Sequence, residues 1–204
     1  MAIPITVSKD MQKRIVLDRK KPLCFYDNHL LLSNNNKLYT LNLNSFEVEY
    51  LTSISRHYLH QLLGKNRHLY RLLRLGIHYA VYAKGKIHFV YAKKLYVLDI
   101  SDHTLAVEFT FNRGKGPLTM AVVNQPFGNF DSGIYFGEYF NNPNKDQVNV
   151  YFKAIRGSDW INIFTFPQGA INHIHAIVPD LFRNKMWILT GDFDDAAGMW
   201  IADM

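Results

Sequence analysis

The feature that most constrains this chain is an internal repeat of short alternating runs. The run KLYTLN at residues 37–42 returns as KLYVLD at residues 94–99, an offset of 57 residues. The related runs VNVY, at residues 148–151, and GMWI, at residues 198–201, follow at further offsets of 55 and 49 residues. Repeats of this length, each with room for about four strands, predict the blades of a β-propeller. One four-stranded sheet cannot bury both of its faces alone, so such sheets pack face to face.

The sequence between these runs supports the same architecture. Between residues 134 and 200, short runs rich in aromatic and β-branched residues alternate with turns that contain Gly, Asn, Asp and Pro. Such runs suit a pleated, half-buried surface. We expect an all-β fold of four-stranded antiparallel blades, with residues 1–204 as a single domain. Residues 55–63 are the exception, since they predict a short helix that Gly64 ends, with an outer strand and loop as the alternative.

The number of repeats bears on whether the ring closes. Four repeats in 204 residues predict about four blades, and the last run lies only three residues before Met204. Most propellers have more than four blades. We therefore expect an incomplete ring, formed by the front portion of a longer protein or by a truncated one. An open ring exposes blade faces and strand edges, so self-association through them is an expected interaction.

Composition excludes several classes of protein. The chain has no run of about 18 apolar residues, so no membrane span is expected. Its first residues lack the basic-then-apolar pattern of a secretory signal, and Cys24 is the single cysteine. One cysteine cannot form an internal disulfide and fits a reducing compartment. We therefore expect a cytoplasmic protein.

The charge is distributed unevenly along the sequence. The net charge is +6, and between Glu49 and Asp99 there is no acidic residue but nine Lys or Arg and five His. A stretch of one sign can attract nucleic acid or acidic glycans. These charges form neither a dense block nor a helical stripe, so we expect them to point outward from separate loops and strands. Nucleic acid is therefore not a favoured partner.

Polar residues between the apolar runs are the candidates for chemistry. His173 and His175 lie two residues apart, so a strand directs both to one face, and the innermost strand of a blade lines the central channel. We expect Glu138, Asp180 and Asp192 to converge at the mouth of that channel. His173, His175 and Asp180 would bind a divalent metal such as zinc or manganese. Glu138, His173, His175 and Asp192 would serve acid–base work on a sugar or a lactone.

Two further considerations limit this site. The alternative is that all five residues are structural and hydrogen-bond to backbone groups between blades. Asp192, Asp194, Asp195 and Gly198 are superficially similar to a calcium loop, but they lack the 12-residue frame and the final Glu, so a solvated hairpin turn is expected.

Part of the sequence resembles a known group of proteins. The runs at residues 112–118, 133–142, 171–175 and 190–200 resemble an uncharacterised bacterial group of sialidase-like propellers, whose repeats are called BNR or Asp-box repeats. The detailed resemblance covers about residues 112–201. It implies a propeller that binds, and in some cases processes, a carbohydrate or related ligand at the channel mouth. A non-enzymatic scaffold that binds a partner is the alternative, and binding of anions or nucleic acid by the basic first half is a third.

The Asp box, whose pattern in the family is S-x-D-x-G-x-T-W, is degraded in this chain. The residues that align with it run from Lys153 to Trp160, and they keep the Gly and the Trp but neither the Ser nor the Asp. The motif ties a hairpin and does not carry catalysis. We expect Trp160, Trp187 and Trp200 to pack between blades. True sialidases carry an Arg-Ile-Pro signature and three clamping arginines, and since no Arg-Ile-Pro occurs here, sialidase activity is not expected.

Overall fold

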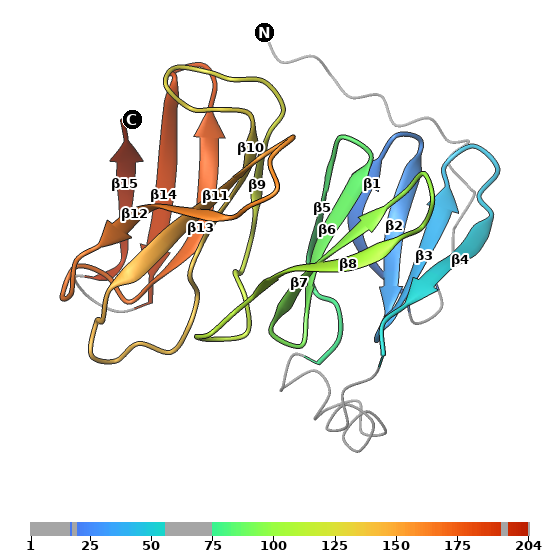
Figure 1. Ribbon diagram of the computed structural model, residues 1–204, viewed down its shortest axis with the longest axis horizontal. Helices are drawn as coiled ribbons and strands as arrows, with labels where there is room; N and C mark the ends of the chain where they lie inside the picture. Colours follow the sequence, from blue (N-terminus) through green and yellow to red (C-terminus); the bar gives the residue numbers. More distant parts are fainter. Residues whose placement is uncertain (1–16, 18–19, 56–74, 193–195, 204) are drawn as a thin grey trace, which may run out of the picture.

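The chain folds into a succession of small antiparallel sheets, as the repeat predicts. The computed structural model describes residues 17, 20–55, 75–192 and 196–203, and the predicted helix at 55–63 lies outside these residues but for its first (Figure 1). The first sheet contains β1 (Lys21–Tyr26), β2 (His29–Asn34), β3 (Lys37–Asn42) and β4 (Val48–Ser53). The second contains β5 (Ala80–Ala83), β6 (Lys86–Tyr91), β7 (Lys94–Asp99) and β8 (Leu105–Thr110).

The second half of the chain repeats this arrangement. The third sheet contains β9 (Ala121–Val123), β10 (Gly133–Gly137), β11 (Val148–Ala154) and β12 (Ile161–Phe166). The fourth sheet has three strands, β13 (His173–Asp180), β14 (Lys185–Gly191) and β15 (Gly198–Ala202). Within the described part, no helix has the length and apolar character needed to cross a membrane.

The four repeated runs occupy equivalent places in the fold. They form β3, β7, β11 and β15, each of which is the third strand of its sheet. The prediction of an all-β fold built from antiparallel propeller blades is therefore confirmed. In the part of the chain that the structure describes, the fourth blade has one strand fewer than the other three.

The hydrophobic core lies between consecutive sheets. Leu38 of the first sheet packs in one cluster with Ile87 and Phe89 of the second. Leu95 of the second sheet shares the next cluster with residues of the third, among them Phe136. Val150 of the third sheet joins a cluster with residues of the fourth. Each of the first three sheets therefore buries one face against the sheet that follows it in the chain.

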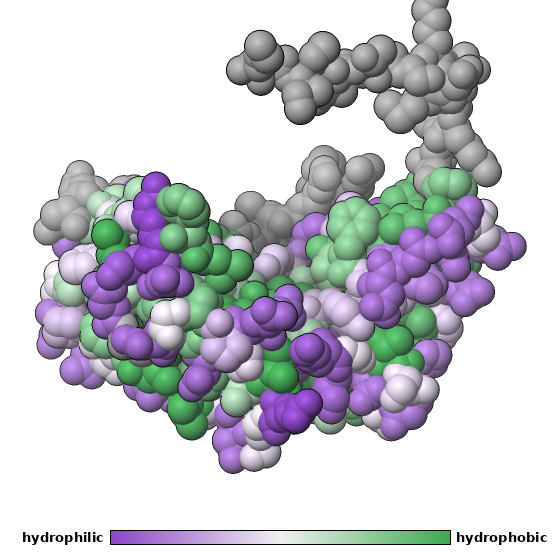
Figure 2. All heavy atoms as spheres, turned by 90° about the horizontal axis from the view of Figure 1, so that it is seen from above, coloured by the Kyte–Doolittle hydropathy of each residue, from purple (hydrophilic) through white to green (hydrophobic). Residues whose placement is uncertain are grey.

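The sheets fan out in chain order without a closing joint. Contacts run from β1 to β5, from β5 to β9 and from β9 to β13, so the first strand of each sheet is its innermost. Among the described residues, no strand contact of comparable extent joins the fourth sheet to the first. Figure 2 shows the described part as a curved body that is hollowed along its upper margin. An open arc is what the sequence predicts.

Two tryptophans occupy the joints between sheets, as expected. Trp160 lies against Phe109 of the second sheet and Phe136 of the third, with ring centroids 6.3 and 4.9 Å away. Trp200 of β15 lies edge-on to Phe166 of β12 at 5.4 Å. These two residues are packing aromatics, and their positions join successive blades.

A charged network also joins the second and third sheets. Glu108 of β8 accepts hydrogen bonds from Lys153 of β11 and lies 3.1 Å from Nδ1 of His88 on β6. The three side chains are largely buried, with 13%, 11% and 5% of their surface exposed. Burial raises the pKa of Glu108, but the hydrogen bonds and charges of His88 and Lys153 outweigh it and hold that pKa at about 2.

Candidate metal centre

The two histidines singled out from the sequence begin the innermost strand of the fourth sheet. His173 and His175 project to the same side of β13, with ring centroids 5.0 Å apart and planes inclined by only 13°. Their Nε2 atoms are 3.0 Å apart. The pairing of β13 with β14 shifts register between Ile174 and Ala176, next to His175.

Asp192 joins the histidines because of the antiparallel pairing of β13 with β14. Gly191, the last residue of β14, lies opposite His173, so the next residue of the chain reaches the two rings. Oδ2 of Asp192 lies 3.1 Å from Nε2 of His173, and Oδ1 of Asp192 lies 3.0 Å from Nε2 of His175. Residues that are 17 to 19 positions apart in sequence thus form one cluster.

The spacing of these three groups suits a metal ion. One ligand atom from each of His173, His175 and Asp192 lies within 4.8 Å of the others. Ligands placed tetrahedrally about zinc at bond lengths of about 2.0–2.1 Å lie roughly 3.3 Å from one another. Two imidazole nitrogens and a carboxylate are also a common catalytic ligand set, which leaves one coordination position open.

Surrounding groups hold the first histidine in place. Nδ1 of His173 is 3.0 Å from the backbone oxygen of Phe140, a partner to which it donates when the proton is on Nδ1. That tautomer leaves the Nε2 lone pair free for a metal. The ring of Tyr139 lies 4.5 Å from that of His173 and 5.7 Å from that of His175. The segment that follows β10 therefore supports the cluster from one side.

The cluster is buried on one side and open on the other. The side chain of His173 is 8% exposed, whereas those of His175 and Asp192 are 34% and 39% exposed. An ion from solvent can therefore reach the three ligand atoms, and a fourth ligand can approach from the same side.

Residue 191 has to be glycine for His175 to keep this position. A Cβ atom built on Gly191 would lie 2.6 Å from Cε1 and 2.9 Å from Nε2 of His175, which is closer than real Cβ contacts come. The absence of a side chain here lets the imidazole lie directly against the end of β14.

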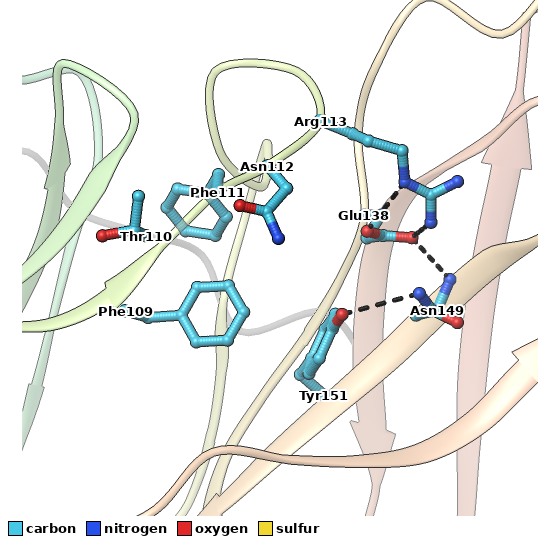
Figure 3. Close-up of a pocket in the computed structure, with 8 residues that line it drawn as sticks. All are labelled: Phe109, Thr110, Phe111, Asn112, Arg113, Glu138, Asn149 and Tyr151. Carbon is cyan, nitrogen blue, oxygen red and sulfur yellow. Dashed lines mark hydrogen bonds and ion pairs between the residues drawn. The ribbon is translucent and has the colours of Figure 1, made fainter.

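Glu138 is engaged elsewhere, in a salt bridge between the second and third sheets. Its carboxylate accepts hydrogen bonds from the guanidinium of Arg113 and, at 2.9 Å, from the backbone N–H of Asn149 (Figure 3). Arg113 also donates to the backbone oxygen of Gln147 at 2.7 Å and lies over the ring of Phe140. The carboxylate of Glu138 is therefore held by partners and is not directed at the histidines.

A cavity of about 160 Å³ lies beside this salt bridge. Glu138 and Arg113 form part of its wall, and Figure 3 shows the aromatic rings on the other side of it. The remaining lining residues come from the end of β8 and from β11, and they are Phe109, Thr110, Phe111, Asn112, Asn149 and Tyr151. The backbone of Glu138 links this region to the histidines, since its oxygen accepts a hydrogen bond from the N–H of Ile174 at 3.0 Å.

The structure separates Asp180 from the histidines with which the sequence grouped it. His173 and Asp180 are the first and last residues of the eight-residue strand β13, about 23 Å apart at the usual rise of a strand. Asp180 accepts hydrogen bonds from Nε1 of Trp187 and from Arg183, and these partners lower its pKa. It ties the hairpin between β13 and β14. Asp192 takes its place beside the histidines.

Comparison with known proteins identifies the fold and no family. No family model matches the chain, and no curated protein matches it. The computationally designed protein Ika4 is 8% identical, with a TM-score of 0.53, and the match covers 100% of this chain and 99% of Ika4. The extracellular domain of a one-component system from B. thetaiotaomicron is 11% identical, with a TM-score of 0.52 over 83% of this chain and 19% of that one.

A chain of the nidogen–laminin complex is similar to the same degree. It is 9% identical, with a TM-score of 0.51, and the match covers 79% of this chain and 51% of that one. This chain thus spans about half the length, or less, of the natural chains it matches. At such identities the likeness shows the fold alone: this chain is a set of propeller blades.

Proposed function

We propose that this propeller binds a divalent metal ion through His173, His175 and Asp192, and that the metal holds a ligand at the inner end of the fourth blade. The observation that carries the proposal is the convergence of three ligand atoms within 4.8 Å on the innermost strand. Zinc and manganese suit two imidazoles and a carboxylate.

The open coordination position indicates the class of ligand. A metal with three protein ligands accepts an oxygen atom of a bound molecule in the fourth position. A carbohydrate, or a related molecule that bears hydroxyl or carboxyl groups, supplies such oxygens. This assignment agrees with the resemblance to sialidase-like propellers, and it concerns binding rather than sialidase chemistry, because Glu138 is already paired with Arg113.

Metal binding should be measurable directly by calorimetric titration. Chain freed of metal with a chelator should bind zinc or manganese at one site. His175→Ala should weaken that binding by more than the 10- to 100-fold typical of losing a supporting group, since it removes a ligand. Asp180→Asn is the matched control and should bind like the unaltered chain, because Asp180 lies at the far end of β13. No saturable binding, or equal binding by His175→Ala, would refute the site.

The ligand itself can be tested separately from the metal. Neutral and carboxylated monosaccharides are titrated into metal-loaded and metal-free chain. Binding that depends on the metal supports the proposed role, and equal binding by both forms shows that the sugar is held elsewhere.

A second function, a scaffold that binds a protein partner, is favoured by a different observation. Glu138 and Asp180 are both satisfied by structural partners, Arg113 in one case and Trp187 with Arg183 in the other. Polar residues that only fix blade geometry are what a scaffold requires. If the chain binds no metal in the titration, binding of a protein partner remains as the proposed function.

A further inference from the structure

The last blade exposes a face that is buried in each of the other blades. The repeat offsets place Met199 of β15 in the position of Leu38, Leu95 and Val150 on the third strands of the other three sheets. Those three residues are 0%, 0% and 3% exposed, whereas Met199 is 69% exposed.

The next position on the same face shows the same contrast. Thr40, Val97 and Phe152 are 5%, 8% and 8% exposed, and their equivalent Ile201 is 55% exposed. In the first three blades this face packs against the following sheet. On the fourth blade this face carries the apolar residues of a joint, but no sheet among the described residues packs against it.

Cross-strand pairing extends this surface over the fourth sheet. Met199 pairs with Leu189, Ile201 pairs with Trp187, and Trp187 pairs with Val178, so these five apolar side chains share one face. Met186 and Ile188, which alternate with them along β14, point the other way into the core shared with the third sheet. We call the exposed side the forward end face.

The first sheet exposes the complementary kind of surface. Phe25 pairs with Leu30, and Tyr39 pairs with Tyr50, on the side of the sheet opposite to the core shared with the second sheet. Val48 pairs with Leu41 on the same side. Phe25, Tyr50 and Val48 are 68%, 56% and 40% exposed, whereas Leu32 and Leu41 in the middle of this side are buried. We call this side the backward end face.

These two surfaces are the two halves of one more joint. Inside the chain, the forward side of each sheet packs on the backward side of the next. Among the described residues no extensive contact joins the two end faces within one copy. A second copy, placed head to tail, brings each forward end face against a backward end face.

We infer that two copies of this chain associate through their end faces into one ring of eight sheets. A two-fold axis relates the copies and makes two identical joints, which closes the assembly and leaves no end face exposed. Eight blades lie within the usual range for propellers. The forward end face includes Leu189 and Val178, each three residues from a metal ligand, but the inference rests on the exposed apolar side chains and is independent of metal binding.

The mass in solution tests this inference. Light scattering after size-exclusion chromatography should give about twice the chain mass of 23.7 kDa over a wide range of concentration. Met199→Asp and Phe25→Asp, each of which places a charge in both joints, should each give the mass of one copy. Phe182→Asp is the control, since Phe182 is 90% exposed in the turn after β13 and outside both end faces, and should leave the mass doubled.

Mixing the two variants distinguishes head-to-tail pairing from pairing of like ends. A mixture of Met199→Asp and Phe25→Asp can form one joint between two unaltered faces, so part of it should recover the doubled mass. Pairing of like ends predicts instead that one of the two variants stays doubled when alone. Each variant should still unfold as a folded single copy does, because the altered side chains are exposed and their replacement leaves the fold intact.

Three results would overturn the inference. The unaltered chain could run as a single copy, which would mean that other residues or another protein cover the end faces. It could form assemblies larger than two copies, which would show that the joints do not close. Its mass could also stay doubled in both variants, which would place the contact elsewhere.

Discussion

Glu108→Gln should lower the free energy of unfolding by roughly 3 kcal/mol, because it leaves Lys153 buried without its counter-charge. The side chain of Lys153 is 11% exposed and forms an ion pair with Glu108 across the joint between the second and third sheets. His88 loses its carboxylate partner in the same change. Chemical denaturation at neutral pH measures the effect, with Glu49→Gln as control. Glu49 is an exposed acid on β4, so its loss should cost no more than about 0.5 kcal/mol.

The same group predicts how stability depends on pH. The pKa of Glu108 is about 2 in the folded chain, below its ordinary value of 4.5. The ionised carboxylate therefore stabilises the fold fully above pH 4.5, and this contribution is lost as the pH falls from 4.5 towards 2. The Glu108→Gln variant should lack that part of the acid dependence. A variant that is as stable as the unaltered chain at neutral pH would show that the network does not join the blades.

Leu95→Ala should destabilise the chain by about 2–5 kcal/mol, whereas Met199→Ala at the equivalent position should change stability by about 0.5 kcal/mol or less. Leu95 is fully buried between the second and third sheets, and its truncation leaves a cavity that the neighbouring sheet can only partly fill. Met199 is 69% exposed, so its truncation leaves none. Truncation at the same repeat position is thus expected to cost much stability in the second blade and almost none in the fourth.

The free energies of unfolding of these two variants have to be compared in a chain that does not associate with a second copy. Both substitutions are made in the Phe25→Asp chain, and unfolding by urea is followed by circular dichroism. Equal costs at the two positions would mean that the fourth blade is covered like the others, which contradicts the open arc.

The sequence predicted the repeat because the signal is local. Each third strand carries its own alternation of polar and apolar residues, so KLYTLN and KLYVLD identify β3 and β7 without any knowledge of their neighbours. The burial of each blade is less visible in the sequence. The exposure of Met199, set beside the burial of Leu95 at the equivalent position, shows that the forward side of the fourth sheet is uncovered among the described residues.

The candidate site was only partly predictable, because pairing between strands decides which polar groups meet. His173 and His175 share a face at strand spacing, and this can be read from the sequence. Asp180 is nearer to them in sequence than Asp192, yet a straight strand carries it away and the return of β14 brings Asp192 back. The salt bridge of Glu138 with Arg113 joins segments from two sheets, and no local pattern indicates it.

Tyr139 belongs to the run at residues 133–142, and its position beside the histidines is not among the expectations drawn from the sequence. Its ring contacts both histidines across the joint between the third and fourth sheets. A signal was available, since Tyr139 directly follows Glu138, which the sequence already placed near the channel mouth.

The most direct test is the anomalous scattering of zinc in a crystal of the chain soaked with the metal. The account predicts a single strong peak within bonding distance of Nε2 of His173, Nε2 of His175 and a carboxylate oxygen of Asp192, at about 2.0–2.2 Å. A peak at some other cluster, or no peak beside these three groups in crystals that have bound zinc, would contradict it.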